Sequence, residues 1–104
     1  MHHFIFRGYD NPATSAQIRA RVRPAHRAYI REVHHGVRVI AGGMVITDSG
    51  EDATGTLLIL EGSDRAAVML YLEGDPYWKA ALFARYEVDR WDWGLGAPPE
   101  APIR

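Results

Sequence analysis

The chain has 104 residues, of which 47% are hydrophobic and 24% are charged, and its formal net charge is −1. This length and composition are typical of one soluble globular domain. The small net charge provides no field that favours nucleic acid or an anionic membrane as a partner. The absence of cysteine excludes disulfides, iron–sulfur ligation and thiol catalysis. No apolar run approaches the roughly 20 residues of a membrane span, and the start becomes polar too quickly for a signal peptide, so we expect a cytoplasmic protein.

Four strands and two helices are predicted in chain order. Short apolar runs bounded by turn residues predict strands at 3–9, 37–45, 56–61 and 84–89. Apolar residues at helical spacing predict helices at about 24–35 and 64–74. Pro24 is expected at the first position of the former, where a missing N–H does no harm, so that residues 16–22 become a loop with a helical turn.

The order strand, helix, strand, strand, helix, strand is that of the ferredoxin-like βαββαβ unit. In this α+β fold an antiparallel four-stranded sheet carries two helices on one face. We assign residues 1–93 to this domain and residues 94–104 to a Pro-rich C-terminal tail. Since the strand at 56–61 is apolar on both faces, the sheet face without helices needs a cover. The simplest cover is a second copy of the sheet, which predicts a homodimer formed through the sheet face.

Two ionisable residues in apolar surroundings are the candidates for chemistry. His26 falls on the inward stripe of the helix at 24–35, where a histidine is either a core residue with a satisfied hydrogen bond or a general acid–base group. Asp75 precedes Pro76 after the second predicted helix, where it either caps a short helical turn or takes part in chemistry. The residue types alone leave both interpretations open.

Short motifs carry a resemblance to a known family. They are Arg23-Pro24-Ala25-His26, Ala41-Gly42-Gly43, and Asp75-Pro76-Tyr77 leading into Leu82-Phe83 and Tyr86-Glu87-Val88. In this order, on a βαββαβ frame and over most of residues 3–93, the chain resembles the YCII-related family. The resemblance implies a dimeric α+β barrel with a pocket in which His26 and Asp75 are functional. The family's activity is mostly unassigned, so the resemblance narrows the fold more than the function.

His26 and Asp75 are therefore the predicted catalytic pair. In an ideal ferredoxin-like unit, the start of the first helix and the end of the second lie at opposite ends of the helical layer, and a helix of this length spans about 16 Å. The pair meets only if residues 75–83 fold back along the layer, or else each residue belongs to a different site. The predicted substrate-binding residues are Arg23, Gly42, Gly43, Tyr77, Trp78 and Phe83.

The predicted binding residues also have plainer interpretations. The pair Gly42-Gly43 inside a β-branched strand indicates a bulge or a close approach by a ligand or another chain. Arg23 either holds an anionic group of a substrate or lies in solvent. Aromatic residues such as Tyr77 and Trp78 suit the wall of a small pocket, and equally a plain core.

Two further patterns do not predict a site. The histidine doublets at 2–3 and 34–35 project their side chains in different directions, so we expect no metal. The basic run at 19–31 lacks interleaved aromatics and is typical of a solvated face, so we expect no nucleic-acid partner. The expected partners are a second copy of the chain and a small-molecule ligand, with no membrane.

These observations predict a small cofactor-independent enzyme in which His26, with Asp75 as its partner, acts as general acid or base on a small organic substrate. The reaction would be of lyase, isomerase or hydrolase type. One alternative is a non-catalytic dimeric domain that binds a small ligand or serves as an accessory. Another is a monooxygenase of the dimeric α+β barrel type, whose pocket activates oxygen on an aromatic compound.

Overall fold

The computed structural model describes residues 1–98, which form seven elements. They are β1 (His2–Asp10), α1 (Ser15–Ile30), β2 (Arg38–Ile46), β3 (Ala53–Gly62), α2 (Arg65–Gly74), α3 (Pro76–Lys79) and β4 (Phe83–Trp91). Residues 94–98 follow β4 without helix or strand, and the rest of the predicted tail, 99–104, lies outside the described residues. Within the described part of the chain, no helix is long and apolar enough to cross a membrane.

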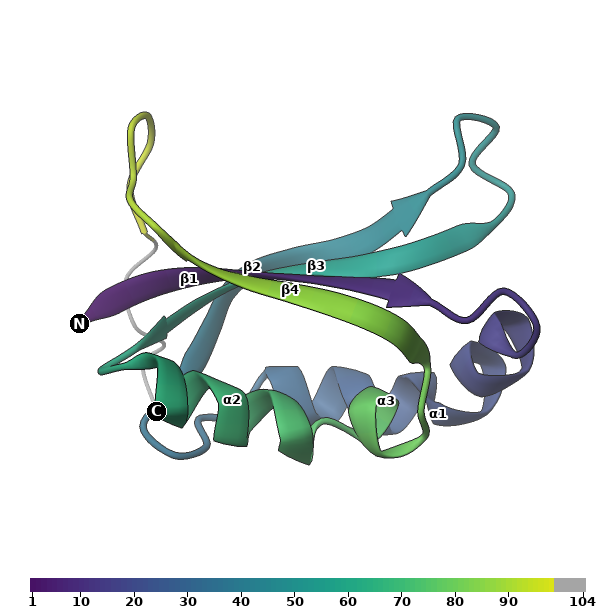
Figure 1. Ribbon diagram of the computed structural model, residues 1–104, viewed down its shortest axis with the longest axis horizontal. Helices are drawn as coiled ribbons and strands as arrows, with labels where there is room; N and C mark the ends of the chain where they lie inside the picture. The colour runs from purple at the N-terminus through teal and green to yellow at the C-terminus, as the bar shows by residue number, and fades with distance from the viewer. Residues whose placement is uncertain (99–104) are drawn as a thin grey trace.

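The strands form one antiparallel sheet in the order β2-β3-β1-β4. All three helices lie on one face of this sheet (Figure 1). The predicted α+β, ferredoxin-like arrangement is confirmed, with β3 and β1 at the centre of the sheet. The short helix α3 is an addition, and it follows α2 almost without a break.

The core lies between the sheet and the helices. Every second residue of β1 and β3 points toward the helices, as the period of two in a strand requires. Eight buried residues form the main cluster: Phe4, Phe6, Val37, Leu58, Leu60, Val68, Tyr71 and Leu72. Full burial of a side chain such as Leu or Phe contributes about 1.5–3 kcal/mol, so this cluster is the principal source of stability.

The first helix differs from the prediction, because Pro24 does not begin it. α1 runs without interruption from Ser15 to Ile30, and Pro24 lies inside it. Proline lacks the N–H that would bond the carbonyl of Ala20, but Ala20 is exposed, so water can satisfy that carbonyl. The predicted loop at 16–22 is therefore the first half of the helix.

A buried ion pair holds this first half of α1 against the sheet. The Arg19 guanidinium donates from Nε to Asp10 Oδ2 at 2.7 Å and from Nη2 to Asp10 Oδ1 at 3.0 Å. The same Nη2 lies 2.8 Å from the carbonyl oxygen of Gly55 and 3.0 Å from Thr56 Oγ1, while Ser15 Oγ donates to Asp10. These partners satisfy a charge that would otherwise be costly to bury.

The end of α1 also differs from the predicted boundary at residue 35. The helix stops at Ile30, and the turn toward β2 uses two residues in the left-handed region, His35 with φ 55° and Gly36 with φ 71°. Gly36 adopts this region without steric cost, which suits the turn between α1 and β2.

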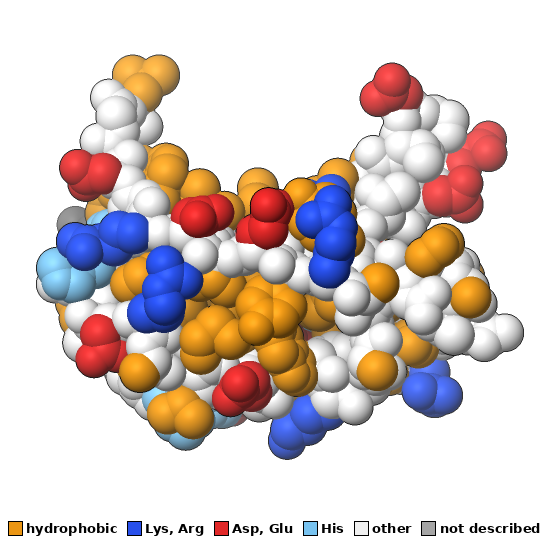
Figure 2. All heavy atoms as spheres, in the orientation of Figure 1, with side chains coloured by type: hydrophobic (Ala, Val, Ile, Leu, Met, Phe, Trp, Pro, Cys, Tyr) orange, Lys and Arg blue, Asp and Glu red, His pale blue; other side chains and the backbone are white. Residues whose placement is uncertain are grey.

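The opposite face of the sheet carries no helix and lies between two raised arms, the β2–β3 hairpin and the segment after β4 (Figure 1). On the β2–β3 half it is apolar, and Ala41, Val45, Leu57 and Ile59 border a shallow groove of about 230 Å³. Figure 2 shows hydrophobic side chains in the hollow between the arms. Leu57 is 39% exposed, so within one chain the central strand β3 is covered on one face only.

Replacing the internal proline should stabilise the fold. Proline inside a helix destabilises the folded state by about 3 kcal/mol. By restricting the unfolded chain, the same residue stabilises the protein by only about 1 kcal/mol or less. We therefore expect Pro24→Ala to raise the free energy of unfolding by about 1–2 kcal/mol, measured by urea denaturation.

Pro12→Ala is the matched control, because Pro12 lies in the turn before α1 rather than inside it. That substitution should destabilise slightly, through the unfolded chain alone. Equal effects of the two substitutions would show that Pro24 exerts no strain on the helix.

Candidate active site

His26 is buried on the inward face of α1, with 7% of the residue exposed. Its Nδ1 lies 2.8 Å from Asp75 Oδ1 and 2.9 Å from Asp75 Oδ2. An ionised carboxylate can only accept hydrogen bonds, so Nδ1 carries a proton, and in the neutral imidazole Nε2 is then the nitrogen with the free lone pair. The imidazole also stacks on the Tyr77 ring, with centroids 4.0 Å apart and planes inclined by 16°. Both contacts restrain the orientation of the ring.

Asp75 lies between α2 and α3 and holds two partners at once. Its Oδ1 accepts a hydrogen bond from the Tyr77 backbone N–H at 2.9 Å, which caps α3 directly before Pro76. The same carboxylate accepts from His26 Nδ1. The cap and the histidine partner, two alternatives at the level of sequence, are thus present together.

The pair meets because the two long helices differ in length. α1 begins at Ser15, so His26 lies well inside the helix rather than near its start. α2 has only 10 residues and ends beside the last turn of α1, where Tyr29 Oη donates to the Tyr71 carbonyl at 2.6 Å. A Cβ on Gly74 would collide with the Tyr29 hydroxyl, so a residue without a side chain allows this close approach.

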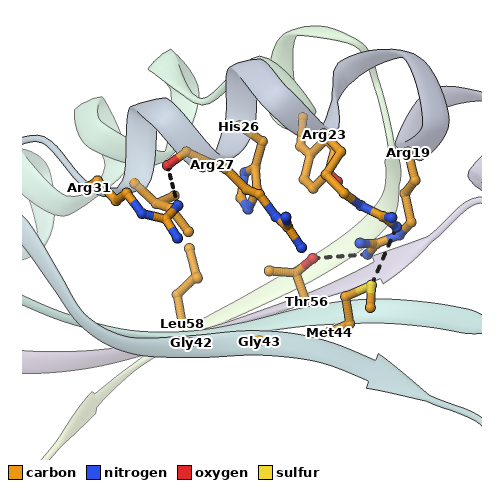
Figure 3. Close-up of a pocket in the computed structure, with 12 residues that line it drawn as sticks. Arg19, Arg23, His26, Arg27, Arg31, Gly42, Gly43, Met44, Thr56 and Leu58 are labelled. Carbon is orange, nitrogen blue, oxygen red and sulfur yellow. Dashed lines mark hydrogen bonds between the residues drawn. The ribbon is translucent and has the colours of Figure 1, made fainter. Parts of the chain in front are cut away.

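His26 borders a cleft of about 450 Å³ between α1 and the sheet (Figure 3). The helical wall carries His26 and four arginines, namely Arg19, Arg23, Arg27 and Arg31. The sheet wall is formed by Gly42, Gly43, Met44, Thr56 and Leu58, and Tyr77 also lines the cleft. Asp75 lies behind His26 and is not among the lining residues.

The two predicted glycines lie on the sheet wall and have different surroundings. A Cβ on Gly42 would come within 2.6 Å of Leu58 Cδ2, whereas a Cβ on Gly43 would meet nothing within 4 Å. The β-bulge predicted for this pair lies just ahead of it, where the register shifts between Val39 and Ala41. The glycines therefore leave this stretch of the wall without side chains.

Trp78 and Phe83 lie outside this cleft. They border a second cavity of about 430 Å³ beside β4, together with Tyr86 and Arg85. Phe6 meets the Phe83 ring at 5.3 Å between centroids, so the two predicted binding residues also pack against the core. The predicted binding residues thus divide between two cavities, with Arg23, Gly42, Gly43 and Tyr77 beside His26.

The tyrosines near the pair are poor candidates for a base. Burial, and secondly the negative charge of Asp75, raise the pKa of Tyr29 above its ordinary value. Burial also raises the pKa of Tyr71, with the neighbouring Tyr29 as the next cause. Both hydroxyls remain protonated at neutral pH, which leaves His26 as the group suited to accept a proton here.

Sequence reasoning missed Arg27 and Arg31 as residues of the site. The signal was present, because the arginines recur every four residues and so share one helix face. Expecting the helix to start at Pro24 separated Arg19 from the others and concealed the row. In the part of the chain that the structure describes, no group of three or more His, Cys, Asp or Glu side chains is arranged to hold a metal ion.

Comparison with known families covers nearly all of the described residues. The family model of the YCII-related domain matches residues 1–92. The chain belongs to the YCII-related family. The resemblance carried by the sequence motifs is thereby confirmed, and a comparison with curated proteins finds no match.

Among the solved structures, one enzyme is similar to this chain over most of its length. The 5-chloro-2-hydroxyhydroquinone dehydrochlorinase of Burkholderia phenoliruptrix, in complex with 2,5-dihydroxybenzoquinone, is 33% identical, with a TM-score of 0.75. The match covers 88% of this chain and 95% of that one.

More distant structures share the fold alone. A putative antibiotic biosynthesis monooxygenase of Nitrosomonas europaea is 16% identical, with a TM-score of 0.53 over 91% of this chain and 100% of that one. A NIPSNAP domain protein of Burkholderia xenovorans is 14% identical, with a TM-score of 0.53 over 95% of this chain and 100% of that one.

The double role of Asp75 predicts a large loss of stability on its removal. Asp75→Ala deletes a helix cap, worth about 1 kcal/mol, and leaves a buried imidazole N–H without an acceptor, at about 1–3 kcal/mol. We expect the free energy of unfolding to fall by about 2–4 kcal/mol in urea denaturation. Asp75→Asn should cost less, because the amide oxygen still accepts one bond.

Asp64→Ala is the matched control, since Asp64 caps α2 through the Ala67 N–H at 2.9 Å and has no histidine partner. It should lose only the capping contribution, about 1 kcal/mol. Equal losses for Asp64→Ala and Asp75→Ala would mean that the bond to His26 contributes nothing.

Proposed function

We propose that this YCII-related protein is an enzyme that transfers protons on a small hydroxylated ring compound. His26 serves as general base and acid, and Asp75 positions it. The observation that carries the proposal is the buried bond between His26 Nδ1 and the Asp75 carboxylate, at 2.8 Å. This bond selects one tautomer and leaves Nε2 for a ligand in the cleft that His26 lines. A positioned group of this kind typically accelerates proton transfer by about 10²–10⁴-fold.

Both the cleft and the similar solved structure favour a ring as the substrate. The cavity of about 450 Å³ has a helical wall with His26 and a sheet wall that lacks side chains at Gly42 and Gly43. A flat molecule fits between two such walls. The dehydrochlorinase that is 33% identical acts on a chlorinated hydroxyhydroquinone, which supports the same class of compound here.

Proton transfer is sufficient for the loss of HCl from such a ring. His26 Nε2 accepts the proton of one ring hydroxyl, and the chlorinated carbon takes up a proton in its place. Chloride then leaves with the electron pair of its bond as a second hydroxyl loses its proton. The sum is loss of HCl and formation of a hydroxyquinone, and no external oxidant is consumed because the carbon–chlorine bond accepts the electron pair.

Loss of the imidazole should abolish this reaction without loss of the fold. We expect His26→Gln to slow chloride release from 5-chloro-2-hydroxyhydroquinone by at least about 100-fold, followed with a chloride electrode. Asp75→Asn should slow it less, because the general base remains and only its orientation suffers.

His2→Gln provides the control, since His2 is an exposed histidine at the far end of β1. It should leave chloride release unchanged. Full activity of His26→Gln would show that the acid–base assignment is wrong. Binding of hydroxylated rings by the wild-type protein without release of chloride would also contradict it, and would support a domain that only binds its ligand.

We further propose that the protein is a homodimer formed through the sheet face without helices. The groove bordered by Leu57, Ile59 and their neighbours on β2 supports this arrangement, because an apolar sheet face in water is normally covered. A second copy supplies an identical and self-complementary surface.

Light scattering at micromolar concentration should give about twice the mass of the chain, and Leu57→Glu should reduce it to the monomer mass by placing a charge in the interface. Leu70→Glu is the control, because Leu70 is 51% exposed on α2, on the other side of the sheet. Gly43→Ala is a further test. The added Cβ meets no atom of the same chain within 4 Å, so a loss of the dimer mass on this substitution would mean that the Cβ collides with a second copy. A monomeric wild-type protein contradicts the proposal.

A further inference from the structure

The cleft beside His26 carries a row of positive charges that the acid–base pair does not use. Arg19, Arg23, Arg27 and Arg31 recur at four-residue spacing on α1 and all line the cavity. A row of exposed arginines on a helix is usually a solvated face. Here the row faces the sheet across the cavity, with its side chains directed into the space between the two walls (Figure 3).

The positive charge of Arg19, the first arginine of the row, is neutralised by the carboxylate of Asp10. Arg19 is 3% exposed and pairs with Asp10 through two hydrogen bonds, and its remaining contacts go to a backbone carbonyl and the Thr56 hydroxyl. Its charge and its donors are committed to holding α1. It therefore supports the cleft and is not available to a ligand.

The other three arginines face the cavity without a carboxylate. Arg23 Nη2 lies 3.6 Å from Met44 Sδ, and Arg31 donates to the Arg27 carbonyl oxygen at 2.8 Å. Within residues 1–98, none of Arg23, Arg27 and Arg31 forms an ion pair with an Asp or Glu side chain, and no acidic residue lines the cleft. The cleft is thus locally cationic in a chain whose formal net charge is −1.

We propose that the substrate of this site is an anion, and that Arg27, flanked by Arg23 and Arg31, binds its oxyanion while His26 acts on the ring. This inference rests on the proposed function and specifies the charge of its substrate. Arg27 follows His26 directly in α1, and its side chain extends into the cavity toward Thr56 (Figure 3). A guanidinium donates two parallel hydrogen bonds to a planar oxyanion, which matches a carboxylate or an ionised ring oxygen.

The energetics favour an anionic over a neutral ligand. Like charges four residues apart on a helix repel each other, and no carboxylate of the cleft offsets this repulsion. A bound oxyanion removes the repulsion and adds charge-assisted hydrogen bonds. Such bonds correspond to a preference of about 10- to 100-fold over a neutral ligand of the same shape.

Binding of two matched ring compounds tests the inference without any turnover. Gentisate carries a ring carboxylate, and gentisamide has the same shape with a neutral amide. We expect calorimetry to show at least about tenfold tighter binding of gentisate to the wild-type protein, and this preference should weaken at high salt. Arg27→Gln should reduce the preference to near equality. 2,5-Dihydroxybenzoquinone has no carboxylate and is anionic through its ring oxygens. Tight binding of this compound that is lost in Arg27→Gln would show that the arginine binds an ionised ring oxygen, whereas tight binding of gentisate alone would show that it binds a carboxylate.

Arg21→Gln is the matched control, because it removes the same charge from an exposed position of α1 that does not line the cleft. It should leave the preference for gentisate unchanged. Equal affinity for gentisate and gentisamide together with an affinity for 2,5-dihydroxybenzoquinone that Arg27→Gln leaves unchanged would overturn the inference. Equal effects of Arg21→Gln and Arg27→Gln, or no binding of either anion, would overturn it as well. The His26→Gln protein should retain the preference for anions, so a failure of the catalytic proposal and a failure of this one give different results.

Discussion

The arrangement of the site depends on one buried carboxylate. Asp75 is 3% exposed, and a charge in such a place is tolerated only with partners that stay in position. It has two, the Tyr77 N–H at the start of α3 and His26 Nδ1 on α1. The Asp75 carboxylate therefore links α1 to α3. It holds the imidazole of His26 in an orientation in which the ring stacks on Tyr77 and borders the cleft. A cap of one helix is at once the positioning group of a histidine on another.

A second buried carboxylate positions the other end of α1. Asp10 at the end of β1 binds Arg19, and its hydrogen bonds extend to β3 through the same guanidinium. Between Arg19 and His26 the helix is thus anchored at two points, and both anchors lie on the side that faces the protein. The intervening turns are held so that the row of arginines faces the sheet. Arg23 lies between these two anchors and Arg27 directly follows the second, and both line the cleft.

The two faces of the sheet differ in what covers them. The helical face is covered by residues of the same chain, with the main core cluster between β1, β3 and α2. The other face offers an apolar groove on β2 and β3, whereas on the β1–β4 half the guanidiniums of Arg7 and Arg85 both lie over the ring of Tyr9. A covering surface must therefore combine apolar contact on one half with polar contact on the other. A second copy of the chain provides both kinds of surface.

The sequence by itself determined the order of the elements, the ferredoxin-like fold and the central position of β3, because periods of 2 and 3.6 residues and turn residues are local properties. His26 and Asp75 were singled out by the resemblance to the YCII-related family, since their residue types alone left a structural role equally open. It did not determine the length of α1. A proline costs about 3 kcal/mol inside a helix, and the tertiary contacts of the first half of α1, among them the pairing of Arg19 and the burial of Ile18, outweigh that local penalty. The meeting of His26 with Asp75 and the row of arginines follow from that length, whereas Trp78 and Phe83 lie in another cavity because they pack beside β4. They were decided in three dimensions, because they depend on where one helix ends beside another rather than on any residue taken alone.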